Sequence, residues 1–212
     1  MCSDKTLYNY VDYNLFSARN LDLPRKVRYR PRKKSAGHFK VDRSCRFGRT
    51  YKDFLLFMKE HPDTPIVEMD SVEGVKGGNV LLTLHFTDSQ FMLAFIRDAN
   101  TSPSALEFDK KGNRRTSIFY CDPSAPYQKG AVENNHELIR RIAPKGHSFN
   151  PYTQEDMNLM MNHINSYGRR KLNDRSPHAV FSFLHGTDTL LKLDAKCIPK
   201  NAIILHPKLL KK

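Results

Sequence analysis

The sequence predicts an α/β fold in which an antiparallel sheet is followed by helices. Three apolar runs of strand length, 66–70, 80–86 and 91–96, follow one another and are separated by short polar turns. Beyond residue 130 the apolar residues recur at helical spacing instead. With 212 residues, the chain is long enough to bury one sizeable core.

Two helices are expected before the sheet. Residues 3–16 place Leu7, Tyr10 and Val11 on one face, and Ser3 or Asp4 can cap the start. Because one short amphipathic helix cannot bury its own face, residues 1–20 are interpreted as the last helix of a small unit. A second helix is expected over 51–59.

After the three strands we expect one more strand, over 117–121, and then helices. Gly130 introduces a helix over about 131–142, and Thr153 caps a helix that runs to about 167. A short helix is predicted over 179–184. The tail at 203–207 is predicted to be an edge strand.

The charge of the chain favours a polyanionic partner. Lys and Arg number 35 against 22 Asp and Glu, which gives a formal charge of +13, and nucleic acid is the commonest partner for such a field. The alternative is a merely soluble basic protein.

Cysteine usage and hydropathy bear on the compartment. The four cysteines lie far apart in the sequence and include no C-x-x-C pair. They fit neither a zinc site nor a disulfide framework, which favours a reducing environment. No apolar run approaches the length of about 18 residues that a membrane span needs. We therefore expect a cytoplasmic protein without membrane contact.

The basic charge is concentrated in residues 24–34, where seven of eleven residues are Lys or Arg and two prolines prevent a continuous helix. Such an extended arm can follow a DNA groove and neutralise phosphates. The alternative is a solvated linker. The predicted DNA contacts in this arm are Arg25, Lys26, Arg28, Arg30, Arg32, Lys33 and Lys34.

Two acidic residues are candidates for metal-dependent chemistry. Asp70 ends the first strand, and Glu133 lies one helical turn after Gly130. Glu137 lies on the same helix face as Glu133 and is its local competitor. Taken singly, Asp70 would more often be a solvated strand-end acid, and Glu133 a solvated residue of a helix face.

Longer motifs give these acids a context. They are Glu68-Met69-Asp70-Ser71-Val72-Glu73-Gly74, Leu82-Thr83-Leu84-His85-Phe86 and Tyr127-Gln128-Lys129-Gly130-Ala131-Val132-Glu133-Asn134. Together with the basic arm, they closely resemble the bacterial insertion-sequence transposases of the family numbered thirty. The resemblance runs over nearly the full chain. It implies an RNase H-like, retroviral-integrase-like core with a mixed sheet and flanking helices.

The resemblance also implies a catalytic centre of two Asp and one Glu that holds two Mg²⁺ or Mn²⁺ ions, which clamp the attacking and leaving oxygens of a phosphoryl transfer. Asp70 matches the first acid, and Glu133 matches the third. Lys129, next to that motif, is expected to contact DNA.

The second acid of the family pattern has no counterpart in this chain. In the family a crossing helix and a central strand carrying that Asp follow the third strand. Here only about 20 residues separate the strand ending near 96 from the run at 117–121, and a crossover alone needs about a dozen. We therefore expect an internal deletion near 102–103 that leaves the central strand and helix incomplete.

The expected organisation has four parts. Residues 1–20 are a remnant of a helix-turn-helix DNA-binding unit, 21–49 a basic linker, 50–150 the deleted core and 151–212 its helical end. The expected function is DNA binding and recombination, with strand cleavage and transfer defective for want of the second Asp. The alternatives are a non-catalytic remnant that binds DNA or oligomerises and interferes with intact transposase, and a fragment without function. DNA is the expected partner, and self-association is a further expectation.

Overall fold

The computed structural model describes residues 2–18, 44–98, 116–122 and 125–210. The chain divides into two units, Met1–Asp42 and Arg43–Lys212. Among the described residues, no helix is both long and apolar enough to cross a membrane. The basic arm at 24–34 and the junction near 102–103 both lie outside the described residues.

The first unit contributes helix α1, Asp4–Asp12. It begins where the sequence predicts, because the Ser3 hydroxyl accepts a hydrogen bond from the Thr6 amide at 3.2 Å. The helix ends four residues short of the predicted 3–16. Asn14, two residues past its end, adopts a positive φ of 57°, which does not continue a helix.

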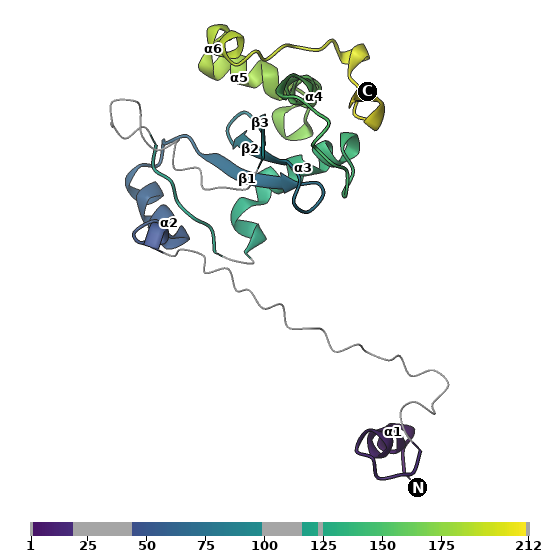
Figure 1. Cartoon of the computed structure of the whole chain (residues 1–212). Coiled ribbons are helices and arrows are strands. Elements are labelled where there is room, and N and C mark those ends of the chain that lie inside the picture. Colours follow the sequence, from purple (N-terminus) through teal and green to yellow (C-terminus); the bar gives the residue numbers. More distant parts are fainter. Residues whose placement is uncertain (1, 19–43, 99–115, 123–124, 211–212) are drawn as a thin grey trace. The chain divides into compact units, whose positions relative to one another are not determined.

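The second unit is built on a three-stranded antiparallel sheet in the order β1-β2-β3 (Figure 1). The strands are β1 (Val67–Glu73), β2 (Val80–Phe86) and β3 (Phe91–Arg97), so the predicted meander is confirmed and β1 runs three residues past the predicted end. Met69 pairs with Leu84, which in turn pairs with Leu93.

Two helices cover one face of the sheet. Helix α3 spans Gly130–Ile142 and packs against β1 and β2, while α4 spans Gln154–Ser166 and packs against β3. Both confirm predicted helices, and the Thr153 cap of α4 forms a full capping box with Asp156. The core between these layers includes Leu81, Met92, Ile139, Phe149 and Met160, none of which is exposed.

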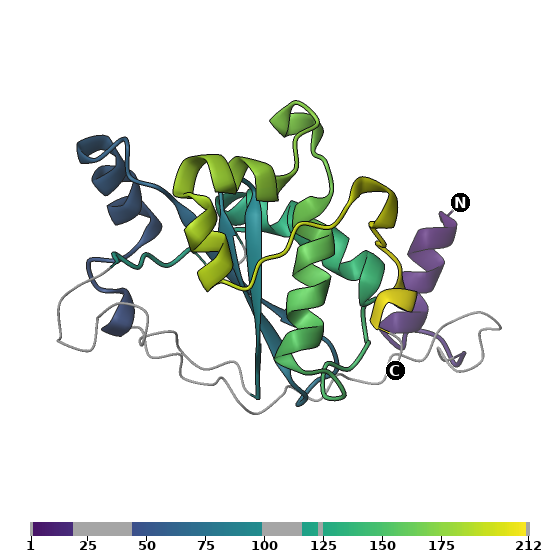
Figure 2. The same cartoon turned by 90° about the horizontal axis from the view of Figure 1, so that it is seen from above.

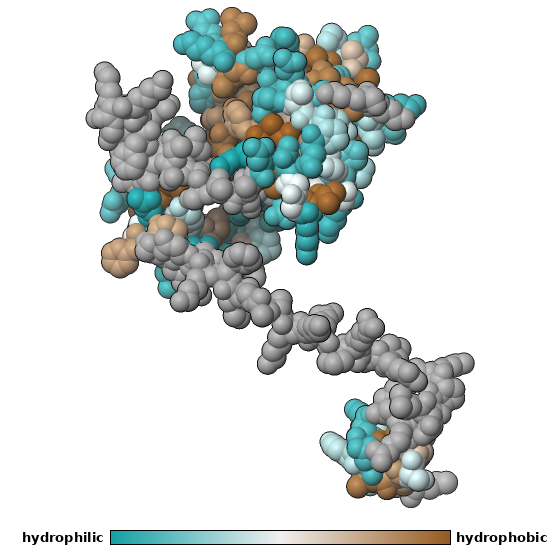
Figure 3. Space-filling view, in the orientation of Figure 1, coloured by the Kyte–Doolittle hydropathy of each residue, from teal (hydrophilic) through white to brown (hydrophobic). Residues whose placement is uncertain are grey.

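The opposite face carries a smaller apolar cluster. Phe91 stacks on Phe181 with ring centroids 4.3 Å apart, and Leu190 is buried beside them. Phe181 belongs to α5 (Pro177–His185), which confirms the helix expected at 179–184, and Leu190 belongs to α6 (Thr187–Lys192), which the sequence did not predict. Apolar surface also lies over these two helices (Figure 3), where Phe183 is 87% and Leu191 77% exposed.

Helix α4 also satisfies the free edge of β3. The Asn165 side chain both accepts from the Met92 amide, at 2.9 Å, and donates to the Met92 carbonyl, at 2.8 Å. Gln154 likewise accepts from the Ile96 amide and donates to the Ala94 carbonyl. These amides take the place of a further strand, so this edge is closed to pairing with another chain.

Two predicted strands are wrong. Residues 117–121 form only an isolated bridge between Thr50 and Tyr120, because Phe119 packs against α2 (Tyr51–Glu60), the helix predicted at 51–59, rather than beside β1. The tail at 203–207 is not a strand either. Residues 203–206 lie between two short 3₁₀ helices, Lys200–Ala202 and Pro207–Leu210, and the Ile204 amide donates to His163 instead of to a neighbouring strand.

Candidate functional site

The candidate site lies between β1 and the amino-terminal half of α3. The register places Glu68 opposite His85 and Asp70 opposite Thr83 on neighbouring strands. In an antiparallel sheet, directly opposed residues share a face, and alternate residues of one strand also share a face. These four side chains are therefore on the same side of the sheet as Val72, which is the side that α3 covers.

The Asp70 carboxylate is bound to a cation of the same chain. The Lys129 ammonium lies 2.9 Å from Asp70 Oδ1, and each side chain of this pair is 28% exposed. Lys129 ends the 3₁₀ helix Pro126–Lys129, which leads directly into α3. The acid predicted to be a metal ligand and the lysine predicted to contact DNA thus neutralise one another.

On the other side of the carboxylate is His136, whose Nδ1 lies 3.9 Å from Asp70 Oδ2. The Thr83 hydroxyl donates to the Asp70 carbonyl at 2.9 Å, so its oxygen is left to accept, and His136 Nε2 at 2.9 Å is the donor. In neutral His136 this leaves Nδ1 unprotonated. Burial lowers the pKa of His136, and Arg140 and Lys129 lower it further, although Asp70 opposes this shift.

Glu68 performs a structural task that the sequence did not reveal. Its Oε2 accepts a hydrogen bond of 2.6 Å from the Val132 amide in the first turn of α3, a helix for which Lys129 offers no side-chain cap. A carboxylate at this position satisfies a free N–H group and interacts favourably with the helix dipole. Burial raises the pKa of Glu68 despite that hydrogen bond and Lys129, and Glu133 adds to the increase.

Glu133 lies beside this acid but is directed differently. Val132 is completely buried, whereas Glu133, the next residue, is exposed, and so is its competitor Glu137. Within the described ranges, Asp70 is paired with Lys129, and no hydrogen bond or ion pair joins it to Glu133. The inward acid next to α3 is therefore Glu68, which a strand-alternation argument from Asp70 could have found.

A second polar pair is buried deeper on the same sheet face. His85 is fully buried, and its Nε2 accepts from the Asn135 side-chain amide at 2.7 Å. Nδ1 of His85 has no hydrogen-bond partner among the described residues. Burial lowers the pKa of His85 to about 4, and the charge of Arg169 and the nearby His136 add to the shift, against the opposing effect of Asp88. The imidazole is therefore neutral at physiological pH.

The residues present do not fit the two-metal centre that the motif resemblance implies. Such a centre needs several carboxylates that converge without a competing cation. Among the residues that the structure describes, no group of three or more His, Cys, Asp or Glu side chains could hold a metal ion, and Asp70 is paired with Lys129. The seven predicted DNA contacts of the arm lie in 24–34, outside the described residues.

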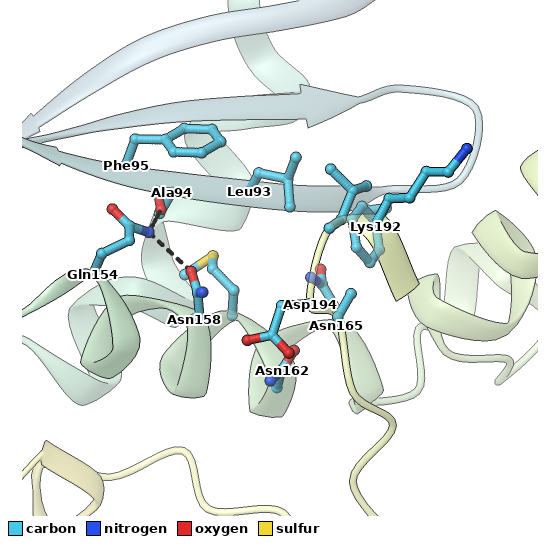
Figure 4. Close-up of a pocket in the computed structure, with 13 residues that line it drawn as sticks. Leu93, Ala94, Phe95, Gln154, Asn158, Asn162, Asn165, Lys192 and Asp194 are labelled. Carbon is cyan, nitrogen blue, oxygen red and sulfur yellow. Dashed lines mark hydrogen bonds between the residues drawn. The ribbon is translucent and has the colours of Figure 1, made fainter. Parts of the chain in front are cut away.

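The cavity in Figure 4 lies elsewhere in the second unit. It has a volume of about 190 Å³ and is bounded by β3, α4 and the end of α6. Gln154 joins the Ala94 carbonyl and the Asn158 side chain across one wall, and Lys192 and Asp194 come from the opposite one. None of the predicted site residues lines this cavity.

Comparison with known proteins finds transposases of insertion sequences. The transposase for insertion sequence IS1086 of Cupriavidus metallidurans is 35% identical over 65 residues, which are 31% of this chain and 19% of that protein. The transposase InsI of IS30A from Escherichia coli is 33% identical over 63 residues, covering 30% and 16% of the two chains. A probable transposase for IS1161 of Streptococcus salivarius is 26% identical over 188 residues, 79% of this chain and 55% of that one.

The chain thus spans between about a sixth and about half of these curated relatives. No protein-family model matches it, and no solved structure does.

Proposed function

We propose that the chain is an insertion-sequence transposase of the IS30 type, which binds DNA but whose own strand cleavage and transfer are defective. The observation that carries the proposed defect in strand cleavage and transfer is the ion pair of Asp70 with Lys129 at 2.9 Å. The proposed DNA binding rests on the relatives and on the charge of +13.

The arrangement of the second unit supports an RNase H-like core. Three antiparallel strands, with an acid in the middle of the first and a helix packed over that strand, follow the order that the motifs imply. We propose that the strand carrying the second Asp would lie beside β1. In the described part of the chain the sheet ends at β1, where Arg140 donates to the Glu73 carbonyl at 2.9 Å.

The charge of the site explains why chemistry would fail. Two divalent ions need a strongly negative ligand set, and here the Lys129 ammonium occupies one oxygen of Asp70 while Glu133 is exposed on α3. We propose that these residues therefore do not bind two Mg²⁺ or Mn²⁺ ions together. No step of strand transfer can then proceed at this site.

The test of the defect is a cleavage and strand-transfer assay. The purified full chain is incubated with labelled duplex that carries insertion-sequence ends, in Mg²⁺ and separately in Mn²⁺, beside an intact transposase of the same type. We expect no nicked or joined product above background. Product from this chain that disappears in an Asp70→Asn variant would refute the proposal, because contaminating nuclease would not respond to that change.

The test of DNA binding uses the basic arm. A variant with Arg25, Arg28, Arg30 and Arg32 all changed to Ala should bind duplex DNA more weakly, and the slope of log K against log salt should fall by about 0.9 for each phosphate that the variant no longer neutralises. Unchanged affinity and slope would show that the arm does not touch DNA. Failure of the unmodified chain to bind would remove the proposed function altogether.

A DNA-binding chain without strand transfer would occupy element ends without processing them. This is the non-catalytic role in which it competes with intact transposase. Adding the purified chain to an active transposase assay should therefore lower product yield in proportion to end occupancy. The arm variant should no longer inhibit.

A further inference from the structure

The connection between α4 and α5 is an ordered turn, residues 168–176, which we call the basic turn. Its ends are tied by the Arg169 amide donating to the Arg175 carbonyl and the Asp174 amide donating to the Arg169 carbonyl, both at 2.9 Å. Asn173 and Asp174 adopt left-handed φ angles of 53° and 59°, which reverse the chain. In Figure 2 this segment projects from the body of the second unit.

Contacts to α4 anchor the turn at its base. A Cβ at Gly168 would lie 2.9 Å from the Asp174 carbonyl oxygen, so the two backbone segments approach as closely as only glycine permits. The Arg169 guanidinium folds back, donating to the Ile164 carbonyl at 3.2 Å and stacking over the Tyr167 ring at 5.5 Å. The backbone of the turn is therefore fixed before any ligand arrives.

The outer side chains of the turn are cationic and solvent-facing. Arg170, Lys171 and Arg175 are all exposed, and within the described part of the chain no ion pair includes any of them. Asp174 is the only acid within the turn. Arg141, exposed near the end of α3, adds a further positive charge. Burial lowers the pKa of Arg169, and the charge of Arg141 adds to that shift.

The basic turn differs from an ordinary solvated run of charges in the entropy that binding costs. Because its backbone already has one conformation, ligand binding orders no further backbone. Its three outer cations also lie together on one short projecting segment. Arg and Lys of this kind neutralise phosphate oxygens and release the counterions that surround a nucleic acid.

We propose that the basic turn is a second DNA contact, which binds backbone phosphates through Arg170, Lys171 and Arg175 independently of both the arm and the acidic residues. The inference rests on the proposed function, since it assumes that the chain binds DNA. It adds a contact within the second unit, whereas the arm, 24–34, belongs to the first. The ligand class is a phosphodiester backbone, read without base specificity.

The experiment compares two triple variants of the full chain on a fluorescent random-sequence duplex of about 30 base pairs, over salt from about 50 to 300 mM. The test variant is R170A/K171A/R175A. The control, K192A/K200A/K208A, removes the same charge from three other exposed lysines. We expect the test variant to lower the salt slope by about 2 to 3 and affinity at least tenfold, with a much smaller change in the control.

A charge-preserving variant, R170K/R175K, separates charge from folding. It should keep the slope of the unmodified chain, because a phosphate responds to charge more than to the shape of the cation, and thermal melting of every variant reports on the fold. Equal slopes for the test and control variants, with DNA still bound by the unmodified chain, would overturn this inference and leave the proposed function standing. Absence of binding by the unmodified chain would overturn both.

Discussion

Acidification should destabilise the second unit through the buried imidazole of His85. This side chain is fully buried, and its pKa is lowered to about 4 from an ordinary 6.5, chiefly by burial. In the unfolded chain the imidazole regains its ordinary pKa and takes up a proton as the pH falls below about 6.5. The stability that His85 supports is therefore complete above that pH and is lost as the pH falls toward 4.

The size of the effect follows from the two pKa values. With a folded pKa of about 4 and an unfolded pKa of 6.5, linkage gives a loss of about 2 kcal/mol in unfolding free energy between about pH 7 and pH 5. The pKa of Glu68 is raised in the folded state. Its protonation therefore increases the unfolding free energy as the pH falls, which opposes the effect of His85. A comparison of variants is needed to isolate His85.

The assay is urea denaturation of the unmodified chain and of His85→Gln at several pH values. Gln removes the titration and keeps a polar group facing Asn135, so its unfolding free energy should fall by about 2 kcal/mol less between pH 7 and pH 5. His85→Leu, a second variant without the titrating group, should give the same flatter profile. Parallel pH profiles for all three proteins would show that His85 is not the titrating group, whatever their absolute stabilities.

Three further outcomes are expected, each measurable by urea denaturation. Asp70→Asn should cost about 1 kcal/mol by leaving half-buried Lys129 without its acid, and a more stable variant would contradict the structural role of the pair. Phe181→Ala should cost about 3 to 5 kcal/mol, since it empties the stack on Phe91, whereas Phe183→Ala, at an 87% exposed position, should cost little. Gly168→Ala should lower the unfolding free energy by about 1 to 2 kcal/mol and also lower DNA affinity through the basic turn. An unchanged unfolding free energy would show that the Asp174 carbonyl can move aside without cost.

Local chemistry made several elements predictable. The cap at Thr153 and the acids that follow it lie within one helical turn, so the start of α4 could be identified from adjacent residues. Strands β2 and β3 were equally accessible, because turn residues separate their apolar runs. The run at 117–121 has the same local character and still forms no strand, since a strand also requires a neighbour to pair with.

The partners of the acids could not be predicted in this way. Asp70 and Lys129 are 59 residues apart, and Glu68 and Val132 are 64 apart, so neither contact leaves a local pattern. The motifs single out Asp70 and Glu133. Strand alternation puts Glu68 on the same face as Asp70, but it is the packing of α3 on β1 that brings the Val132 amide to Glu68 and leaves Glu133 exposed.

The family resemblance, the basic charge, most helices and the order of the strands were accessible from the amino-acid sequence, because they depend on composition and on residues close together in the chain. The roles of the acidic residues emerged from the folded arrangement instead. A carboxylate responds to whatever cation or amide lies within a few ångströms of it, and here that group is Lys129 for Asp70 and the Val132 amide for Glu68.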